Sequence, residues 1–135
     1  DSFLHIKKER NVMIGKIVFK NEADIPFIAV PLKKNKDNDY PLLPETFLEF
    51  KLNDPKKFDK YCYSDFMEEI NKACDIICDM YETEEIFPDK LPSAIAIVSK
   101  YLKNKKFADI RDYLEKTKEF MEKAIELDTA LIFHF

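Results

Sequence analysis

The stretch Thr46-Phe-Leu-Glu-Phe-Lys-Leu-Asn-Asp-Pro55 marks a change from strand-like to helix-like sequence. Its first seven residues alternate between apolar and polar, which is typical of a strand with one buried face. Asp54 before Pro55 favours the start of a helix, because aspartate caps free N–H groups and proline is tolerated in the first turn. The alternation puts Leu48, Phe50 and Leu52 on one face of the strand and Glu49 and Lys51 on the other.

Strands are expected before this change, and one more at the other end of the sequence. Val12–Phe19 is apolar on both faces, as in a central strand. Pro26 and Pro31 lack N–H donors, so the segment 25–32 is predicted at a sheet edge. The apolar segment 129–135 is expected to pair back into the N-terminal sheet, because it would promote aggregation if it were free. The predicted strands cover residues 2–6, 11–20, 25–32, 46–52 and 129–135.

After Pro55, apolar residues recur at helical spacing and predict helices over residues 55–82, 91–103 and 106–127. Residues 82–89 are interpreted as an acidic loop. The buried face of the first helix is expected to carry Phe58, Cys62, Phe66, Ile70, Ala73, Ile77 and Tyr81. That of the third is expected to carry Phe107, Ile110, Leu114, Thr117, Met121 and Ala124.

Strands first, helices next and one closing strand predict an α+β fold. The expected sheet is small and mainly antiparallel, built from the N-terminal strands plus the C-terminal strand, and packed against about three helices. A length of 135 residues fits a single domain over residues 1–135. Because the sequence begins with Asp1, we expect it to be a fragment or an excised domain of a larger protein.

The composition argues against several classes of protein. Gly15 is the single glycine, so the glycine-rich loops that bind nucleotide phosphates are missing. Two histidines cannot form a three-histidine zinc site, and we expect neither a metal nor a cofactor. A net charge of −4 makes nucleic acid an improbable partner. No apolar run is long enough to span a membrane, so no membrane association is expected.

The cysteines indicate a reducing, intracellular location. Cys62, Cys74 and Cys78 are odd in number and show no disulfide-framework spacing. Cysteine behaves as a small hydrophobic residue, so we expect all three in the core rather than at a metal.

Glu49 and Lys51 are the catalytic candidates. Metal-dependent nucleases place an acid and a lysine two apart on one strand, where the acid binds the metal and the lysine stabilises charge on the phosphate. Asp39 is the candidate for the second acid, with Asp37 and Asp24 as other options. The solvent-exposed face of a half-buried strand explains the same pair without chemistry, and we favour that interpretation.

Two charged clusters are the candidate partner-binding residues, because complementary charge guides protein association. We therefore expect a non-enzymatic protein–protein interaction or regulatory domain of an intracellular protein, for which a viral or bacterial source is one option. Its partner would be another protein or another domain of the same chain. The alternatives are the nuclease-like domain and a small acidic chaperone or immunity-type inhibitor. The basic cluster is Lys33, Lys34 and Lys36, and the acidic cluster is Glu82, Glu84 and Glu85.

Overall fold

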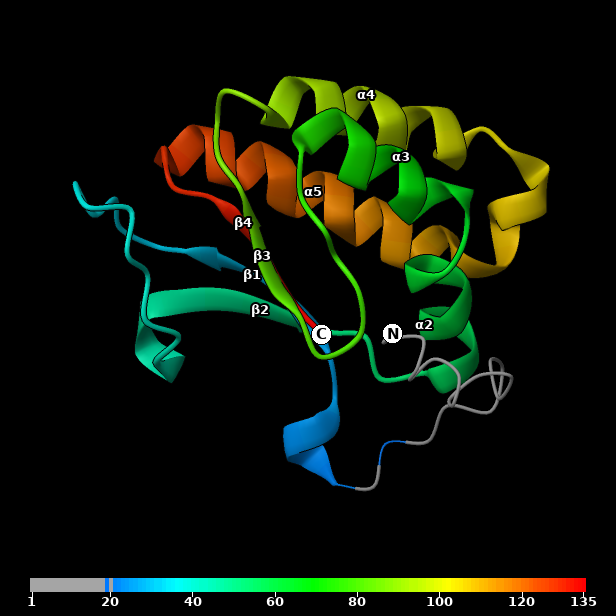
Figure 1. Ribbon diagram of the computed structural model, residues 1–135, viewed down its shortest axis with the longest axis horizontal. Helices are drawn as coiled ribbons and strands as arrows, with labels where there is room; N and C mark the ends of the chain where they lie inside the picture. Colours follow the sequence, from blue (N-terminus) through cyan, green and yellow to red (C-terminus); the bar gives the residue numbers. More distant parts are fainter. Residues whose placement is uncertain (1–18, 20) are drawn as a thin grey trace.

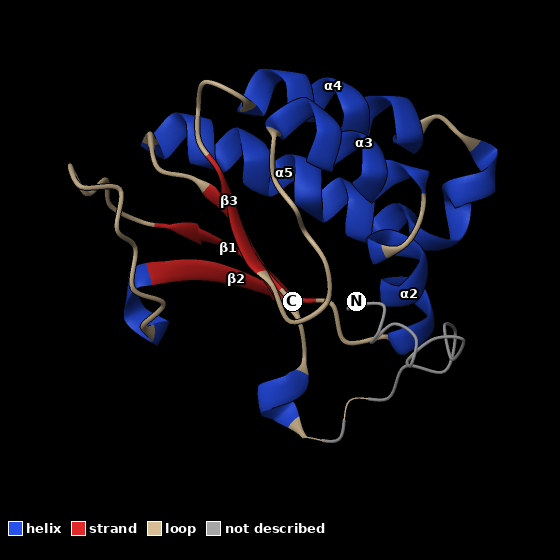
Figure 2. Cartoon of the chain, in the orientation of Figure 1, coloured by secondary structure: helices blue, strands red, loops and turns tan. Residues whose placement is uncertain are grey.

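The computed structural model describes residue 19 and residues 21–135. Within them, helices lie along one side of a four-stranded antiparallel sheet, which confirms the predicted α+β fold (Figure 1, Figure 2). The predicted strands 2–6 and 11–20 lie outside the described residues, apart from Phe19. The strands are β1 (Phe27–Pro31), β2 (Phe47–Lys51), β3 (Thr83–Ile86) and β4 (Leu131–His134), and the helices are α2 (Pro55–Cys62), α3 (Asp65–Cys74), α4 (Leu91–Leu102) and α5 (Arg111–Leu127).

β4 lies inside the sheet, whose order is β2-β1-β4-β3. It pairs with β1, where Phe27 lies opposite His134, and with β3, where Ile86 lies opposite Leu131. The prediction that the segment 129–135 pairs back into the N-terminal sheet is therefore confirmed. β4 joins the β1–β2 hairpin to β3.

The prediction that the segment 25–32 forms a sheet edge is wrong, because β1 lies between β2 and β4. The two prolines stand at the ends of the strand, where a missing donor interrupts no ladder. The Pro26 carbonyl accepts a hydrogen bond from the Leu52 N–H at 2.8 Å. Pro31 lies beyond Ala29, the last β1 residue that is opposite β4. The edge strands of the described sheet are β2 and β3.

The prediction of one helix over residues 55–82 is also wrong, because the segment forms two shorter helices and a loop. α2 ends at Cys62, and α3 begins after Ser64, a residue type that favours helix starts. α3 ends at Cys74, and the next residue, Asp75, has a left-handed φ of 58° that turns the chain out of the helix. The predicted loop 82–89 contains strand β3.

The other helices agree more closely with the sequence. As expected, Asp54 caps α2, where its side chain accepts hydrogen bonds from the N–H groups of Lys56 and Lys57 at 3.0 and 3.2 Å. α4 matches the predicted helix 91–103. The third predicted helix begins as a 3₁₀ helix over Lys105–Ile110, and α5 follows it. Of the helices that the structure describes, none has the length and apolar character needed to cross a membrane.

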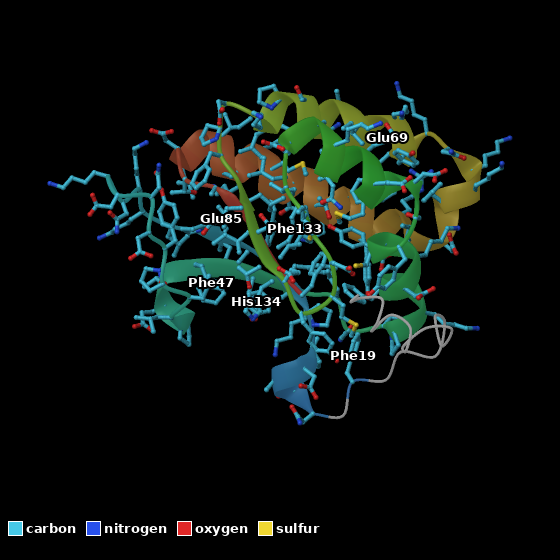
Figure 3. The ribbon with its side chains drawn as sticks, in the orientation of Figure 1. Phe19, Phe47, Glu69, Glu85, Phe133 and His134 are labelled. Carbon is cyan, nitrogen blue, oxygen red and sulfur yellow. The ribbon has the colours of Figure 1, made fainter. Side chains whose placement is uncertain are left out.

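The main core lies between the sheet and the helices. Phe133 of β4 points into it, whereas His134 lies on the opposite face of the sheet, as its position between two buried phenylalanines predicts (Figure 3). On that outer face, part of the loop between β1 and β2 folds over the sheet and buries Tyr40 against Ala29 and Ile132. The predicted burial of the three cysteines is confirmed.

Candidate interaction surface

The loop over residues 75–82, between α3 and β3, exposes two large apolar side chains. Ile77 is 75% exposed and Tyr81 is 78% exposed, more than any other large apolar residue among those described. Both were expected on the buried face of the predicted long helix, and that expectation is wrong because α3 stops at Cys74. Exposed aromatic residues are frequent anchors in protein interfaces.

Hydrogen bonds hold this loop in one conformation. The Asn71 side chain accepts from the Cys78 N–H at 2.8 Å and donates to the Cys78 carbonyl at 3.3 Å. The Tyr81 N–H donates to the Phe135 carbonyl at 3.1 Å, and the Phe135 N–H donates to the Glu82 carbonyl at 2.9 Å. A loop that is already ordered loses little conformational entropy when it binds a partner.

Tyr81 itself has an unfavourable backbone conformation. Its φ of 68° lies in the left-handed region, which costs a residue with a side chain roughly 1–2 kcal/mol. The backbone hydrogen bonds that Tyr81 and Glu82 form with Phe135 connect this part of the loop to the end of β4. Strain of this kind is concentrated at functional segments of proteins.

Carboxylates surround the buried thiol of Cys78 in the middle of the loop. Burial raises the pKa of this thiol, Cys62 raises it further, and the negative charges of Glu84, Asp79 and Glu82 act in the same direction. The three carboxylates therefore act on the same buried thiol, and they belong to the loop that carries Ile77 and Tyr81 or to the strand that follows it. The name acidic loop surface is used below for Ile77, Asp79, Tyr81, Glu82 and Glu84.

A shallow hollow of about 260 Å³ adjoins this surface at the start of α3. Asp65, Glu68 and Asp79 line it, together with the Asn71 amide, and no basic side chain is among its lining residues. The hollow extends the negative charge of the acidic loop surface toward α2.

The predicted basic cluster occupies a separate part of the molecule. Lys33, Lys34 and Lys36 line a hollow of about 650 Å³ within the loop that joins β1 to β2. Asp39 lines the same hollow, and Lys34 forms an ion pair with Asp128 at 3.0 Å. Because nearby carboxylates balance part of its charge, this hollow is less uniform in sign than the acidic loop surface.

Glu85 does not share the surroundings of Glu82 and Glu84. It follows Glu84 along β3 and therefore points to the other face of the sheet. Burial raises the pKa of Glu85, and the charges of Glu84 and Asp39 raise it further. The predicted acidic cluster is thus divided between the two faces of β3.

Glu49 and Lys51 lie on one face of β2, as the alternation predicts. Lys51 forms an ion pair with Glu22, which lowers the pKa of that glutamate. Within the part of the chain that the structure describes, no three histidine, cysteine, aspartate or glutamate residues form a group that could hold a metal ion. The nuclease-like alternative, with Asp39 as its second acid, stays a prediction.

Sequence reasoning found two acidic residues of this surface, Glu82 and Glu84, but missed Asp79 and both apolar residues. Ile77 and Tyr81 continue the four-residue spacing of the preceding helices, so the periodicity placed them in the core. The available signal was Asp75, since aspartate is one of the residues that tolerate the left-handed conformation at a helix end. Comparisons with protein-family models, with curated proteins and with solved structures found no match for this chain.

Proposed function

We propose that this chain is a non-enzymatic protein–protein interaction or regulatory domain that binds its partner through the acidic loop surface. The observation that supports this most is the exposure of Ile77 and Tyr81, at 75% and 78%, on a loop held by hydrogen bonds. Large apolar side chains that a fold keeps in water contribute nothing to its own core. They gain free energy when a partner covers them.

The charge around these anchors defines the kind of partner. Asp79, Glu82 and Glu84 bring negative charge to the rim of the surface, and Asp65 and Glu68 extend it. A partner segment with an apolar centre and flanking lysine or arginine residues fits this arrangement. The rim charges speed up encounter and exclude acidic competitors, while the apolar contacts supply most of the affinity.

The proposal includes an intracellular, reducing location. Cys62, Cys74 and Cys78 are buried, and burial raises the pKa of Cys74 and Cys78. Buried thiols with raised pKa values react slowly and act as structural residues. An odd number of cysteines without disulfide-framework spacing is more frequent in reducing compartments than in secreted proteins.

Affinity capture from a native cell extract, with the whole chain as bait, tests the proposal. The extract is supplied with Mn²⁺ in one experiment and with EDTA in the other. We expect one stoichiometric protein that is retained in EDTA. The double variant Ile77→Ser/Tyr81→Ser should lose it and stay folded, because both side chains are largely exposed. The matched control is Leu43→Ser, which removes a 50% exposed apolar side chain from a different loop and should keep the partner.

Two results would contradict the proposal. One is a partner that the double variant retains at wild-type level. The other is the recovery of nucleic acid alone, and only with Mn²⁺, which would favour the nuclease-like alternative at Glu49 and Lys51. If the captured protein is small, binds at a ratio of 1:1 and is inactivated by this chain, the chain would be identified as an immunity-type inhibitor, which is one member of the interaction class.

A further inference from the structure

Strand β2 leaves a row of backbone groups without a described partner. The Leu52 N–H donates to the Pro26 carbonyl, so the even-numbered residues of this segment bond to β1. The odd-numbered residues therefore direct their N–H and C=O groups to the outer edge, where no described strand pairs with them. These edge residues are Phe47, Glu49 and Lys51.

The side chains of β2 are complementary to those of a second, antiparallel β2. A twofold axis beside Phe50 would place Glu49 of each copy opposite Lys51 of the other. Both residues belong to the set whose backbone groups face the edge, so their pairing also satisfies the antiparallel hydrogen-bond pattern. On the other face of the sheet, the two Phe50 rings would meet across the axis. Opposite charges and aromatic pairs across strands both stabilise a sheet.

From this arrangement we infer that the chain forms a homodimer in which two β2 strands pair edge to edge around Phe50 and extend the sheet from one copy into the other. This surface differs from the acidic loop surface in every residue. The inference gives Glu49 and Lys51 a role that needs no metal: they set the register of the dimer.

Two neighbouring registers of the β2–β2 pair are less favourable. Moving the axis to Glu49 places the two Glu49 carboxylates opposite each other, and like charges in that position destabilise a sheet. Moving it to Leu48 places Lys51 opposite Glu45, which belongs to the 3₁₀ turn over Pro44–Thr46 and not to the strand. The register around Phe50 alone makes two opposite-charge pairs within β2.

The other edge of the described sheet lacks this complementarity. β3 has four residues, of which Glu84 and Glu85 are both acidic, and it carries no basic residue. Two β3 strands would repel each other, and charged edge strands of this type protect proteins from edge-to-edge association. β2 has one charge of each sign, which is the pattern that permits self-pairing.

Phe50 is suitably placed for the contact. It is half-buried, its ring packs edge-on against Tyr113 with centroids 5.9 Å apart, and the Lys116 ammonium lies 5.8 Å from its centre. The remaining exposed part of the ring is available to a second copy. Because the pairing involves short strands, we expect a weak, reversible dimer of the kind formed by small interfaces.

Sedimentation equilibrium of the whole chain tests the inference, over concentrations up to about 1 mM, at which even associations of about −4.1 kcal/mol are detected. We expect a reversible dimer. Glu49→Lys and Lys51→Glu each convert two attractive pairs into two repulsive ones, and each alone should weaken the dimer by about tenfold or more. An equal mixture of the two variants should form heterodimers, and the double variant Glu49→Lys/Lys51→Glu should dimerise again.

The control is Glu115→Lys, a charge reversal of the same size at an exposed position of α5, which should leave the dimer unchanged. Circular dichroism and thermal unfolding of each variant would verify that it is folded. A wild-type chain that stays monomeric at about 1 mM would overturn the inference. A dimer that Glu49→Lys does not weaken, or single variants whose mixture stays monomeric, would overturn it equally.

Discussion

Residues other than glycine carry all of the left-handed backbone that the structure describes. They are Asn38, Asp75, Tyr81 and Asp128. Asparagine and aspartate tolerate this conformation because their short polar side chains bond locally, whereas tyrosine does not. Asp75 and Asp128 end α3 and α5, at the position where glycine is most common in other proteins. With Gly15 as its single glycine, this chain stores strain at helix ends.

Replacing Asp75 with glycine should release part of that strain. We expect Asp75→Gly to stabilise the fold by about 0.5–1 kcal/mol, because the gain at positive φ exceeds the extra freedom of glycine in the unfolded chain. Removing a negative charge from a helix C-terminus acts in the same direction. Urea unfolding measures the effect. Lys72→Gly, inside α3, is the opposite control and should cost about 1 kcal/mol, and a destabilised Asp75→Gly would show that the aspartate side chain is required.

Strand β3 forms although its own sequence does not favour a strand. It is short, half of its residues are glutamates, and it contains no glycine. It also lacks the alternation of apolar and polar residues that distinguishes a strand from a loop in the sequence. Its pairing with β4 forms the strand, since β4 supplies Leu131 and Phe133 opposite it. The consequence is a partly buried carboxylate at Glu85.

Glu85 should make the stability of the fold depend on pH. Burial and the nearby carboxylates raise its pKa above 4.5, so the folded chain holds this proton at a pH where the unfolded chain has released it. The stabilising contribution is complete below 4.5 and is lost as the pH rises through the folded pKa. We expect Glu85→Gln to be more stable than the wild type at pH 7 and to show a flatter decline above 4.5. Glu115→Gln, at an exposed site, serves as the control; a Glu85→Gln curve parallel to the wild type would disprove the assignment.

Local patterns predicted the elements whose stability is local. The alternation in 46–52, the Asp54 cap and the apolar stripe of α5 are all present as expected. The patterns failed where tertiary contacts decide the outcome. The two prolines of 25–32 predicted an edge strand, but they stand at the ends of a central strand. The helical spacing of apolar residues continues through 75–82, although the chain leaves the helix at Asp75. For the same reason, Glu82 and Glu84 of the candidate surface were predictable from the sequence, whereas the exposure of Ile77 and Tyr81 was not.

At the scale of the whole molecule, β4 holds the sheet together. It is the strand between the β1–β2 hairpin and β3, and its residues Leu131, Phe133 and the following Phe135 enter the main core. Tyr61 also lies in this core, where its hydroxyl is 2.7 Å from that of Thr117. β4 therefore links the two parts of the sheet and adds side chains to the core that the sheet shares with the helices.

Deleting residues 129–135 should abolish cooperative folding. The deletion exposes two strand edges and removes five buried apolar side chains, so we expect aggregation and no cooperative thermal transition. His134→Thr, on the outer face of the same strand, retains the pairing and should still unfold cooperatively. A deletion variant that unfolds in one sharp transition would show that β4 is dispensable.

The position of β4 also leads us to expect a particular order of folding. The α4–α5 pair and the β1–β2 hairpin form from neighbouring segments, whereas the pairing of Phe27 with His134 closes a loop of more than a hundred residues. Closing a loop of that length costs chain entropy before the contact contributes any favourable free energy. Contacts of this kind slow folding. We therefore expect β4 to complete the sheet late in folding, and until then β3 lacks its strand partner and β1 lacks one of its two.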